Sequence, residues 1–330
     1  MMKILANSIA AAALCGLVGA AAPARATQYW LGGVDPVIQR LNHKPVMHDY
    51  MGLLSDPAAW RESASKVAAF KVSAQFILFG EPEMIRTVFN GMHARHIKMA
   101  VEIGTVVRLD PCGGGEGYAP PEMADKIGAK LRDLGVTLDY MALDEPVWYA
   151  HEIKQGMTPL HQPFCAYPLN VVAQRAAISI KAMRKYFPGV QVGVIDVVST
   201  SLVPAAQLAR DYGEFASLLQ EAIGARLAFF HADIAWDTNW QATLPLVKRE
   251  MRQRGVPFGI IADGSPNLRT SQEWVNVALS RLRAIEADPA TRPDQIVAQS
   301  WHNLPTMMLP ETRPDTETHL LLEAEEIGGR

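Results

Sequence analysis

The chain has few cysteines and no concentration of charge of one sign. Its 330 residues include 3 cysteines, 31 lysines and arginines, and 34 aspartates and glutamates, which gives a formal net charge of −3. Without a basic cluster, the sequence lacks the electrostatic footprint of a nucleic-acid-binding protein. After the first 26 residues it also lacks any apolar run near the roughly 20 residues that a membrane helix needs. We therefore expect no nucleic-acid partner and no membrane anchor.

Two kinds of cofactor motif are missing as well. No glycine-rich dinucleotide fingerprint follows any apolar segment, which argues against a nucleotide cofactor and against an open doubly wound sheet. The dense His-X-His and His-Glu-X-X-His spacings of many metal sites are also absent. The sequence therefore predicts no cofactor and gives no strong indication of a metal.

The first 26 residues have the pattern of a secretory signal peptide. Lys3 precedes an apolar stretch over 9–22, and Ala24-Arg25-Ala26 supplies a cleavage site. The mature chain would begin at Thr27, and loss of Lys3 and Arg25 would shift the formal charge from −3 to −5. We expect a secreted or periplasmic protein whose residues 27–330 form one domain, a size that α/β barrels commonly reach.

Two cysteines remain after this processing, Cys112 and Cys165. In an oxidising compartment, a disulfide is the expected state of such a pair. The bridge would close a loop of about 50 residues and stabilise the fold by roughly 4 kcal/mol on the chain-entropy model.

Short apolar segments alternate with helical patterns along the mature chain. Near-continuous apolar strands are typical of a parallel sheet covered by helices. The eight predicted strands cover 29–32, 72–79, 97–103, 138–143, 190–197, 227–233, 258–263 and 296–301. The predicted helices between them cover 58–70, 121–134, 171–187, 212–223, 240–254 and 271–287. Eight such repeats favour a closed (β/α)8 TIM barrel over an open sheet.

Acidic residues stand at nearly every predicted strand end. Barrel enzymes place their reacting groups at the carboxyl ends of the strands and in the loops that follow. Charged groups are costly beside an apolar core unless they are paired or used. The acids are Asp35, Glu81, Glu102, Asp144, Glu145, Asp196, Asp233 and Asp263, and the eighth strand ends in Trp301-His302-Asn303.

The segment Tyr140-Met-Ala-Leu-Asp-Glu-Pro146 resembles the strand-four signature of the large clan of retaining (β/α)8 glycoside hydrolases. In that clan an Asn-Glu-Pro motif presents its Glu as the general acid/base, the Asn contacts the sugar 2-hydroxyl, and the nucleophile is a Glu on strand seven. The resemblance implies that Glu145 is the acid/base. This chain has Asp144 in place of the Asn and Asp263 in place of the nucleophilic Glu, and Trp301 matches a Trp at the end of strand eight.

Glycoside cleavage needs one protonated acid at the leaving oxygen and one ionised carboxylate at the anomeric carbon or its water. Glu145 is the predicted acid, because crowding by Asp144 and the other acids would raise its pKa. Asp263 is the first choice for the partner. The other candidates, in order, are Asp196, Asp233 and Glu102. The separation of the two carboxyl groups would decide between retention and inversion.

Flat aromatic faces near the strand ends could stack on sugar rings. The predicted aromatic contacts are Trp30, Trp148, Tyr149 and Trp301. The predicted polar contacts to substrate are Glu102, Asp144, Asp196, His231, Asp233 and Asn303. The expected partner is thus a poly- or oligosaccharide substrate.

Two alternatives from other classes remain open at this point. His231 and Asp233, with Glu102, Glu145 and Asp263, could form a mixed nitrogen and oxygen metal site like those of barrel isomerases and hydrolases. A carbohydrate-binding barrel without catalysis would also account for Asp144 and Asp263 at the two motif positions. The sequence does not predict the sugar, the linkage, the oligomeric state or the role of the C-terminal segment.

Overall fold

The computed structural model describes residues 26–41, 47–109, 111, 113–154 and 164–329. The predicted signal peptide lies almost entirely outside these residues, and so does Cys112. The signal peptide and the disulfide therefore stay predictions. Within the described part of the chain, none of the helices combines the length and apolar character that crossing a membrane requires.

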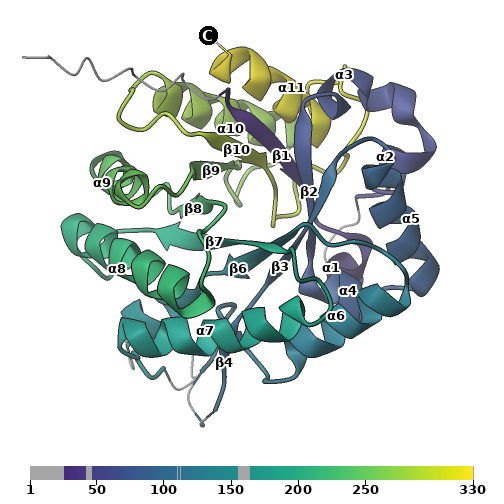
Figure 1. Cartoon of the computed structure of the whole chain (residues 1–330). Coiled ribbons are helices and arrows are strands. Elements are labelled where there is room, and N and C mark those ends of the chain that lie inside the picture. Colours follow the sequence, from purple (N-terminus) through teal and green to yellow (C-terminus); the bar gives the residue numbers. More distant parts are fainter. Residues whose placement is uncertain (1–25, 42–46, 110, 112, 155–163, 330) are drawn as a thin grey trace, which may run out of the picture.

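Eight parallel strands form a closed barrel, which confirms the predicted (β/α)8 architecture (Figure 1). Around the barrel the strand order is β1-β10-β9-β8-β7-β6-β3-β2. The strands are β1 (Gln28–Gly32), β2 (Val67–Ser73), β3 (Lys98–Ile103), β6 (Tyr140–Asp144), β7 (Gln191–Val198), β8 (Phe230–Ile234), β9 (Phe258–Ala262) and β10 (Gln295–Ala298). A small second sheet pairs β4 (Val106–Val107) with β5 (Tyr118–Ala119) in the connection between β3 and β6.

Helices cover the outside of the barrel (Figure 1). They are α1 (Pro36–Leu41), α2 (Gly52–Ser55), α3 (Arg61–Ala64), α4 (Ala74–Phe79), α5 (Pro82–His93), α6 (Met123–Asp133), α7 (Leu169–Arg184), α8 (Ala205–Ile223), α9 (Trp240–Gln253), α10 (Ser271–Glu286) and α11 (Glu317–Gly328). Two short pieces, η1 (Pro57–Trp60) and η2 (Trp148–Glu152), complete the set in the described residues. Helix α10 begins with a capping box between Thr270 and Glu273, which explains its sharp start.

Alternation along the strands decides which side chains fill the barrel. One buried cluster combines a residue from each sector of the barrel, and its members are Trp30, Ala69, Ala100, Ala142, Ile195, Phe229, Ile261 and Val297. Successive side chains of a strand point to opposite faces. The residues two positions further along each strand therefore also point inward, toward the carboxyl end of the barrel.

The second strand and the helix before it were predicted wrongly. Strand β2 spans Val67–Ser73, and the segment predicted as its main part, 74–79, is the helix α4. The predicted helix over 58–70 ends at Ala64. An unbroken apolar run cannot be assigned to strand or helix by periodicity alone. The boundary comes from Ser73, whose hydroxyl accepts a 3.0 Å hydrogen bond from the Phe76 N–H and caps α4.

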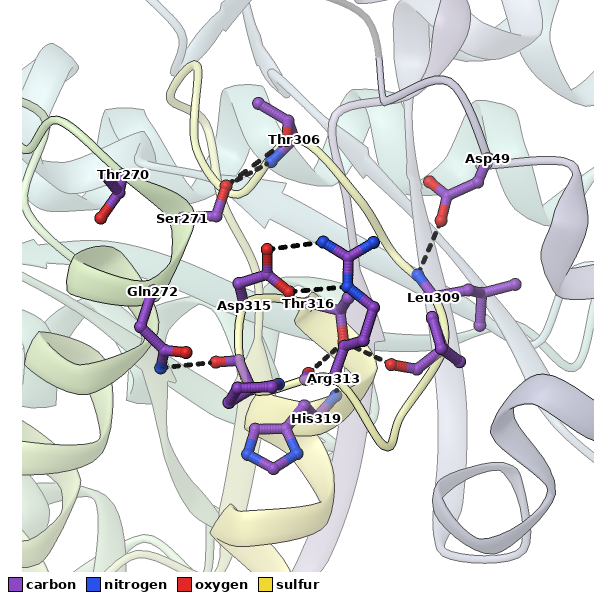
Figure 2. A network of polar contacts seen from close by, with 12 residues as sticks. Asp49, Thr270, Ser271, Gln272, Thr306, Leu309, Arg313, Asp315, Thr316 and His319 are labelled. Carbon is purple, nitrogen blue, oxygen red and sulfur yellow. Dashed lines mark hydrogen bonds and ion pairs between the residues drawn. The ribbon is translucent and has the colours of Figure 1, made fainter.

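The C-terminal segment closes the outer ring of helices. Helix α11 packs against α10, β10, β1 and α3. Figure 2 shows how the segment before it is tied to the body of the protein, with Asp49 accepting a hydrogen bond of 2.7 Å from the backbone N–H of Leu309. Asp49 also accepts one of 2.9 Å from the N–H of Met308. The segment therefore belongs to the barrel rather than extending away from it.

Candidate functional site

A polar cavity of about 660 Å³ lies at the carboxyl ends of the strands. Its charged and amide lining residues are Lys71, Gln75, Glu102, Glu116, Asp144, Glu145, Asp233, Asp237, Asp263, Asn267, Arg281 and Gln299. Trp236 and Trp301 supply aromatic surface at the same cavity. This is the face of the barrel at which TIM-barrel enzymes build their active sites.

Strand register brings the acids together. In β6, Ala142 belongs to the interior cluster, so Asp144 two residues later also points into the barrel. The same alternation turns Glu102 inward from β3 and Asp233 inward from β8. Four predicted acids, Glu102, Asp144, Asp233 and Asp263, therefore line one cavity with Glu145.

Glu145 occupies an unusual backbone conformation directly after β6. Its φ of 42° lies in the left-handed region, which costs a residue with a side chain of order 1–3 kcal/mol. Its N–H donates a 2.9 Å hydrogen bond to the Ile195 carbonyl, which holds it against β7. The residue is only 5% exposed but still lines the cavity. Strain of this kind is characteristic of functional positions.

Burial raises the pKa of the Glu145 carboxyl well above its usual range, and the neighbouring charges of Asp233 and Asp144 raise it further. The Glu145 and Asp233 carboxyl groups are close enough for each to shift the pKa of the other. Burial raises the pKa of Asp233 to about 6, and the Glu145 carboxyl opposes that rise. Glu145 therefore holds the proton of the pair, and Asp233 accepts it as the carboxylate.

Asp263 lies in a different environment. Its Oδ1 accepts a 2.6 Å hydrogen bond from the indole N–H of Trp236, and Arg281 Nη1 lies 3.5 Å from the same oxygen. The Arg281 guanidinium also lies over the Trp236 ring, 4.5 Å from its centroid. Burial raises the pKa of Asp263 to about 7, while Trp236 and Arg281 act to lower it. Trp236 and Arg281 therefore offset part of the burial that disfavours the Asp263 anion.

Lys71 was not predicted as a site residue. Its Nζ lies 2.5 Å from Glu102 Oε2, and its side chain is 1% exposed on the cavity floor. Gln299 Nε2 donates a weaker hydrogen bond of 3.4 Å to the same carboxylate oxygen. Glu102 is therefore engaged by a buried cation. A lysine inside an otherwise apolar strand was the available sequence signal.

Asp196 does not line the cavity, which corrects its predicted role in binding substrate. It alternates with the inward-facing Ile195 and is 0% exposed beneath the helices. Its carboxylate accepts backbone hydrogen bonds of 2.9 and 3.0 Å from Val147 and Trp148. The hydroxyl of Tyr212 donates to it as well, at 3.3 Å. Asp196 thus holds the turn that carries Glu145.

Trp30 and His231 were also predicted as substrate contacts, and this is wrong. Both are buried inside the barrel, in edge-to-face contact with ring centroids 4.9 Å apart, and neither lines the cavity. His231 Nε2 donates to Gln295 Oε1 at 2.7 Å. Burial lowers the pKa of His231 to about 3, so its imidazole is neutral. Both side chains fill the interior below the site.

The remaining predicted contacts divide between the cavity and its surroundings. Trp301 lines the cavity. Trp148 is buried in the turn after Glu145, Tyr149 packs against Gly115, and Asn303 is exposed, and none of these three is among the lining residues. A position at a strand end therefore does not by itself separate residues that line the cavity from residues that do not.

The remaining acids at strand ends have structural roles or lie elsewhere. Asp35 is buried and accepts hydrogen bonds from the N–H groups of Val37 and Ile38 and from the Ser73 hydroxyl. Glu81 is exposed at the start of α5. Neither acid lines the cavity.

One group of cavity residues has the chemistry to hold a cation. Carboxylate oxygens of Glu116, Asp144 and Glu145 lie within 4.8 Å of one another. An all-oxygen set of this kind suits a hard cation such as Mg²⁺ or Ca²⁺. His231, the nitrogen ligand expected for a mixed site, is bonded to Gln295 and does not reach the cavity. The predicted metal site built on His231 is therefore contradicted.

No family model matches the chain, and no curated protein sequence matches it. Solved structures do match. The carboxyl transferase domain of Rhizobium etli pyruvate carboxylase aligns with a TM-score of 0.52 at 11% identity, covering 83% of this chain and 40% of that one. The same domain with pyruvate gives a TM-score of 0.51 at 12% identity, covering 92% and 48%. This chain thus spans less than half of those chains.

A mutant protein in complex with xylotriose aligns with a TM-score of 0.47 at 10% identity, covering 90% of this chain and 96% of that one. A structure named CbXyn10B aligns with a TM-score of 0.47 at 12% identity, covering 84% of each chain. The likeness to the carboxyl transferase domain, at 11–12% identity, establishes a shared fold and leaves the chemistry to the site itself. The chain is an eight-stranded parallel barrel with a cavity at its carboxyl face.

Proposed function

We propose that this protein is a glycoside hydrolase whose general acid is Glu145. The observation that carries the proposal is the placement of Glu145, which is 5% exposed and held at a positive φ directly after β6, in one cavity with Asp233 and Asp263. Glycosidases need one carboxyl group that keeps its proton near neutral pH and one that is ionised. Burial raises the pKa of both Glu145 and Asp263, but only Asp263 has donors, Trp236 and Arg281, that stabilise its anion.

In this mechanism the Glu145 carboxylic acid donates its proton to the glycosidic oxygen as the bond to the leaving sugar breaks. Asp263 acts at the anomeric carbon, either as a nucleophile or as the base that activates water. Trp236 and Arg281 stabilise its negative charge. Asp233 orients the Glu145 proton before transfer, so its role is positioning rather than direct attack on the sugar.

The cavity suits a carbohydrate in size and composition. Sugars are bound by flat apolar faces together with hydrogen bonds from polar side chains. Trp236 and Trp301 provide aromatic surface, and Asp144, Asn267 and Gln299 provide polar groups along the wall. We infer a poly- or oligosaccharide substrate, and we infer export of the protein from residues 1–26. N-terminal sequencing of the mature protein should start at Thr27.

The test compares two aryl glycosides that differ only in the leaving phenol. Glu145→Gln should lower kcat/KM at least about 100-fold for a 4-nitrophenyl glycoside, because loss of a positioned acid costs that much. A 2,4-dinitrophenyl glycoside has a leaving group that needs little protonation, so its rate should fall far less. Equal losses on both substrates would mean that Glu145 is not the acid.

Glu116→Gln is the matched control, because Glu116 is a carboxylate at the same cavity and close to Glu145. It should reduce kcat/KM for both glycosides by a similar and smaller factor. Asp263→Asn should abolish turnover of both, and added azide should restore part of it if Asp263 is the nucleophile. NMR of the first-formed anomer then gives the stereochemical outcome.

The two alternatives predict other results in the same experiments. A metal-dependent enzyme would lose activity on chelation and recover it with Mg²⁺ or Ca²⁺, and Glu116→Gln would then be as damaging as Glu145→Gln. A binding protein would retain oligosaccharides, measured by calorimetry, without hydrolysing them. The proposal requires turnover that survives chelation.

A further inference from the structure

A second cluster of metal-binding side chains lies outside the cavity. Donor atoms of His151, Glu152 and Asp211 lie within 4.8 Å of one another. His151 and Glu152 belong to η2, the turn after Glu145, whereas Asp211 lies on α8. None of the three lines the cavity. The cluster therefore joins the turn that follows the candidate acid to a helix on the outside of the barrel.

A buried carboxylate oxygen of Glu152 is a second, independent observation that points to a ligand at this cluster. The residue is 5% exposed, and its Oε1 has no hydrogen-bond partner among the described residues. An unsatisfied buried oxygen costs roughly 1–3 kcal/mol. A cation between Glu152 and Asp211 would give this buried oxygen a partner.

The surrounding hydrogen bonds prepare the ligands for a metal. His151 Nδ1 lies 2.7 Å from the Tyr167 carbonyl oxygen. A carbonyl only accepts, so Nδ1 carries the proton and Nε2 keeps the lone pair that a metal needs. Gln207 Nε2 donates to both oxygens of Asp211, at 2.7 and 2.9 Å. Histidine ligands with the other ring nitrogen bonded to a carbonyl, and carboxylate ligands held by donors, are the usual outer shell of protein metal sites.

We propose that His151, Glu152 and Asp211 form a Zn²⁺ site. One imidazole and two carboxylates match the nitrogen and oxygen ligands of zinc, and imidazole disfavours the alternatives Mg²⁺ and Ca²⁺. Zinc ligands at about 2.0–2.2 Å from the ion stand roughly 3.3–3.6 Å apart, so small side-chain movements from the present spacing complete the site. His151 is partly exposed, which gives the ion a path from solvent.

The site would stabilise the turn behind Glu145. Tyr212, next to Asp211, donates to Asp196, and Asp196 accepts the backbone N–H groups of Val147 and Trp148. Zinc bound by Glu152 and Asp211 would tie the far end of the same turn to α8. This site is distinct from the cavity, which none of its three ligands lines.

The test uses the full mature chain, stripped with chelator and then titrated with ZnCl₂. Bound zinc is measured by elemental analysis after gel filtration, and stability by thermal unfolding. We expect one Zn²⁺ per chain and a Tm increase of about 5 °C at a hundredfold excess of free Zn²⁺ over Kd. His151→Ala, Glu152→Gln and Asp211→Asn should each weaken binding at least about 100-fold and remove the Tm response.

Glu286→Gln is the matched control, because Glu286 is a buried acid with an unpartnered Oε1 elsewhere in the fold. It should keep full zinc binding. Glu145→Gln should keep it too, which separates this site from the carboxylates of the cavity. Absence of zinc binding by a folded wild-type chain, or equal binding by folded Glu152→Gln, would overturn the proposal.

Discussion

Asp196 Oδ2 accepts a 2.9 Å hydrogen bond from the backbone N–H of Val147, two residues after Glu145. Together with the bond from Trp148, it fixes the turn in which Glu145 adopts its positive φ. Asp196→Asn replaces one acceptor oxygen with a donor that faces an N–H group. We expect kcat to fall about 10- to 100-fold with little change in KM, because the acid is displaced while the cavity wall remains.

A purely structural role for Asp196 would lower the amount of folded protein without altering catalysis by the folded fraction. The measurement is therefore kcat per folded active site, together with the alkaline limb of the pH profile. Because that limb reports Glu145, Asp196→Asn should move it. An unmoved limb and a normal kcat would contradict the positioning role.

The pH dependence of kcat/KM should follow the two carboxyl groups. Asp263, with its pKa raised to about 7 by burial and by Asp233, must be ionised to act, so activity should rise as pH increases through about 7. Glu145 must be protonated, so activity should fall again at higher pH. The profile should be bell-shaped, with its acid limb near pH 7.

Trp236→Phe tests the acid limb of this profile. The Trp236 N–H donates to Asp263 Oδ1 and stabilises the carboxylate. Its loss should raise the pKa of Asp263 and shift the acid limb upward by about one unit, leaving the alkaline limb in place. Trp301→Phe, at the same cavity, is the control and should leave both limbs unmoved.

Removal of one partner of the buried ion pair between Lys71 and Glu102 should lower the free energy of unfolding. Lys71→Met leaves Glu102 without its cation in a largely buried position, and we expect unfolding to become easier by about 3 kcal/mol. Lys71→Met with Glu102→Gln should recover part of this loss. Denaturant titration of the two variants measures the difference, and a double variant less stable than the single one would contradict this account.

Asp49 secures the C-terminal segment by accepting hydrogen bonds from the N–H groups of Leu309 (Figure 2) and Met308. Asp49→Ala leaves both donors unpaired and should lower the free energy of unfolding by about 2–3 kcal/mol. Asp315→Ala is the control from the same network, because the Arg313–Asp315 pair is partly exposed and worth less than about 1 kcal/mol. Equal effects of the two substitutions would argue against a special role for Asp49.

The predicted bridge between Cys112 and Cys165 has a direct assay. Mature protein that is denatured without reductant should contain no titratable thiol, and two thiols should appear after reduction. Two thiols before reduction would contradict the bridge. Removing it should cost roughly 4 kcal/mol of stability on the chain-entropy model, measured with both cysteines replaced by serine.

The barrel was predictable because its strands are apolar on both faces and are separated by clear helix boundaries. Strand β9 was predicted over 258–263 and spans Phe258–Ala262. Strand β2 was misplaced because apolar residues continue into α4, and only the capping interaction of Ser73 separates the two elements. Local periodicity carries no information about such a boundary.

The site was predictable only in part. The prediction treated all strand-end acids alike, although alternation along β7 turns Asp196 away from the interior to which Ile195 points. His231 and Trp30 fill the interior of the barrel below the cavity. The sequence does not show how far along each strand the cavity begins, so it could not distinguish these two residues from the cavity lining. Arg281 reaches Asp263 from α10, 18 residues later in the chain, and no local pattern announces such a contact.

The pairing of β1 with β10 joins the first and last strands of the barrel. Gln295 donates a 3.0 Å hydrogen bond to Gln28, across 267 residues of sequence. A growing polypeptide that has not yet produced β10 leaves β1 with β2 on one side and a bare strand edge on the other. Such an edge is a template for pairing with other chains, and contacts this distant form slowly. Biosynthesis thus passes through a vulnerable period that ends only when the last strand arrives, and that is when molecular chaperones would matter most to this protein.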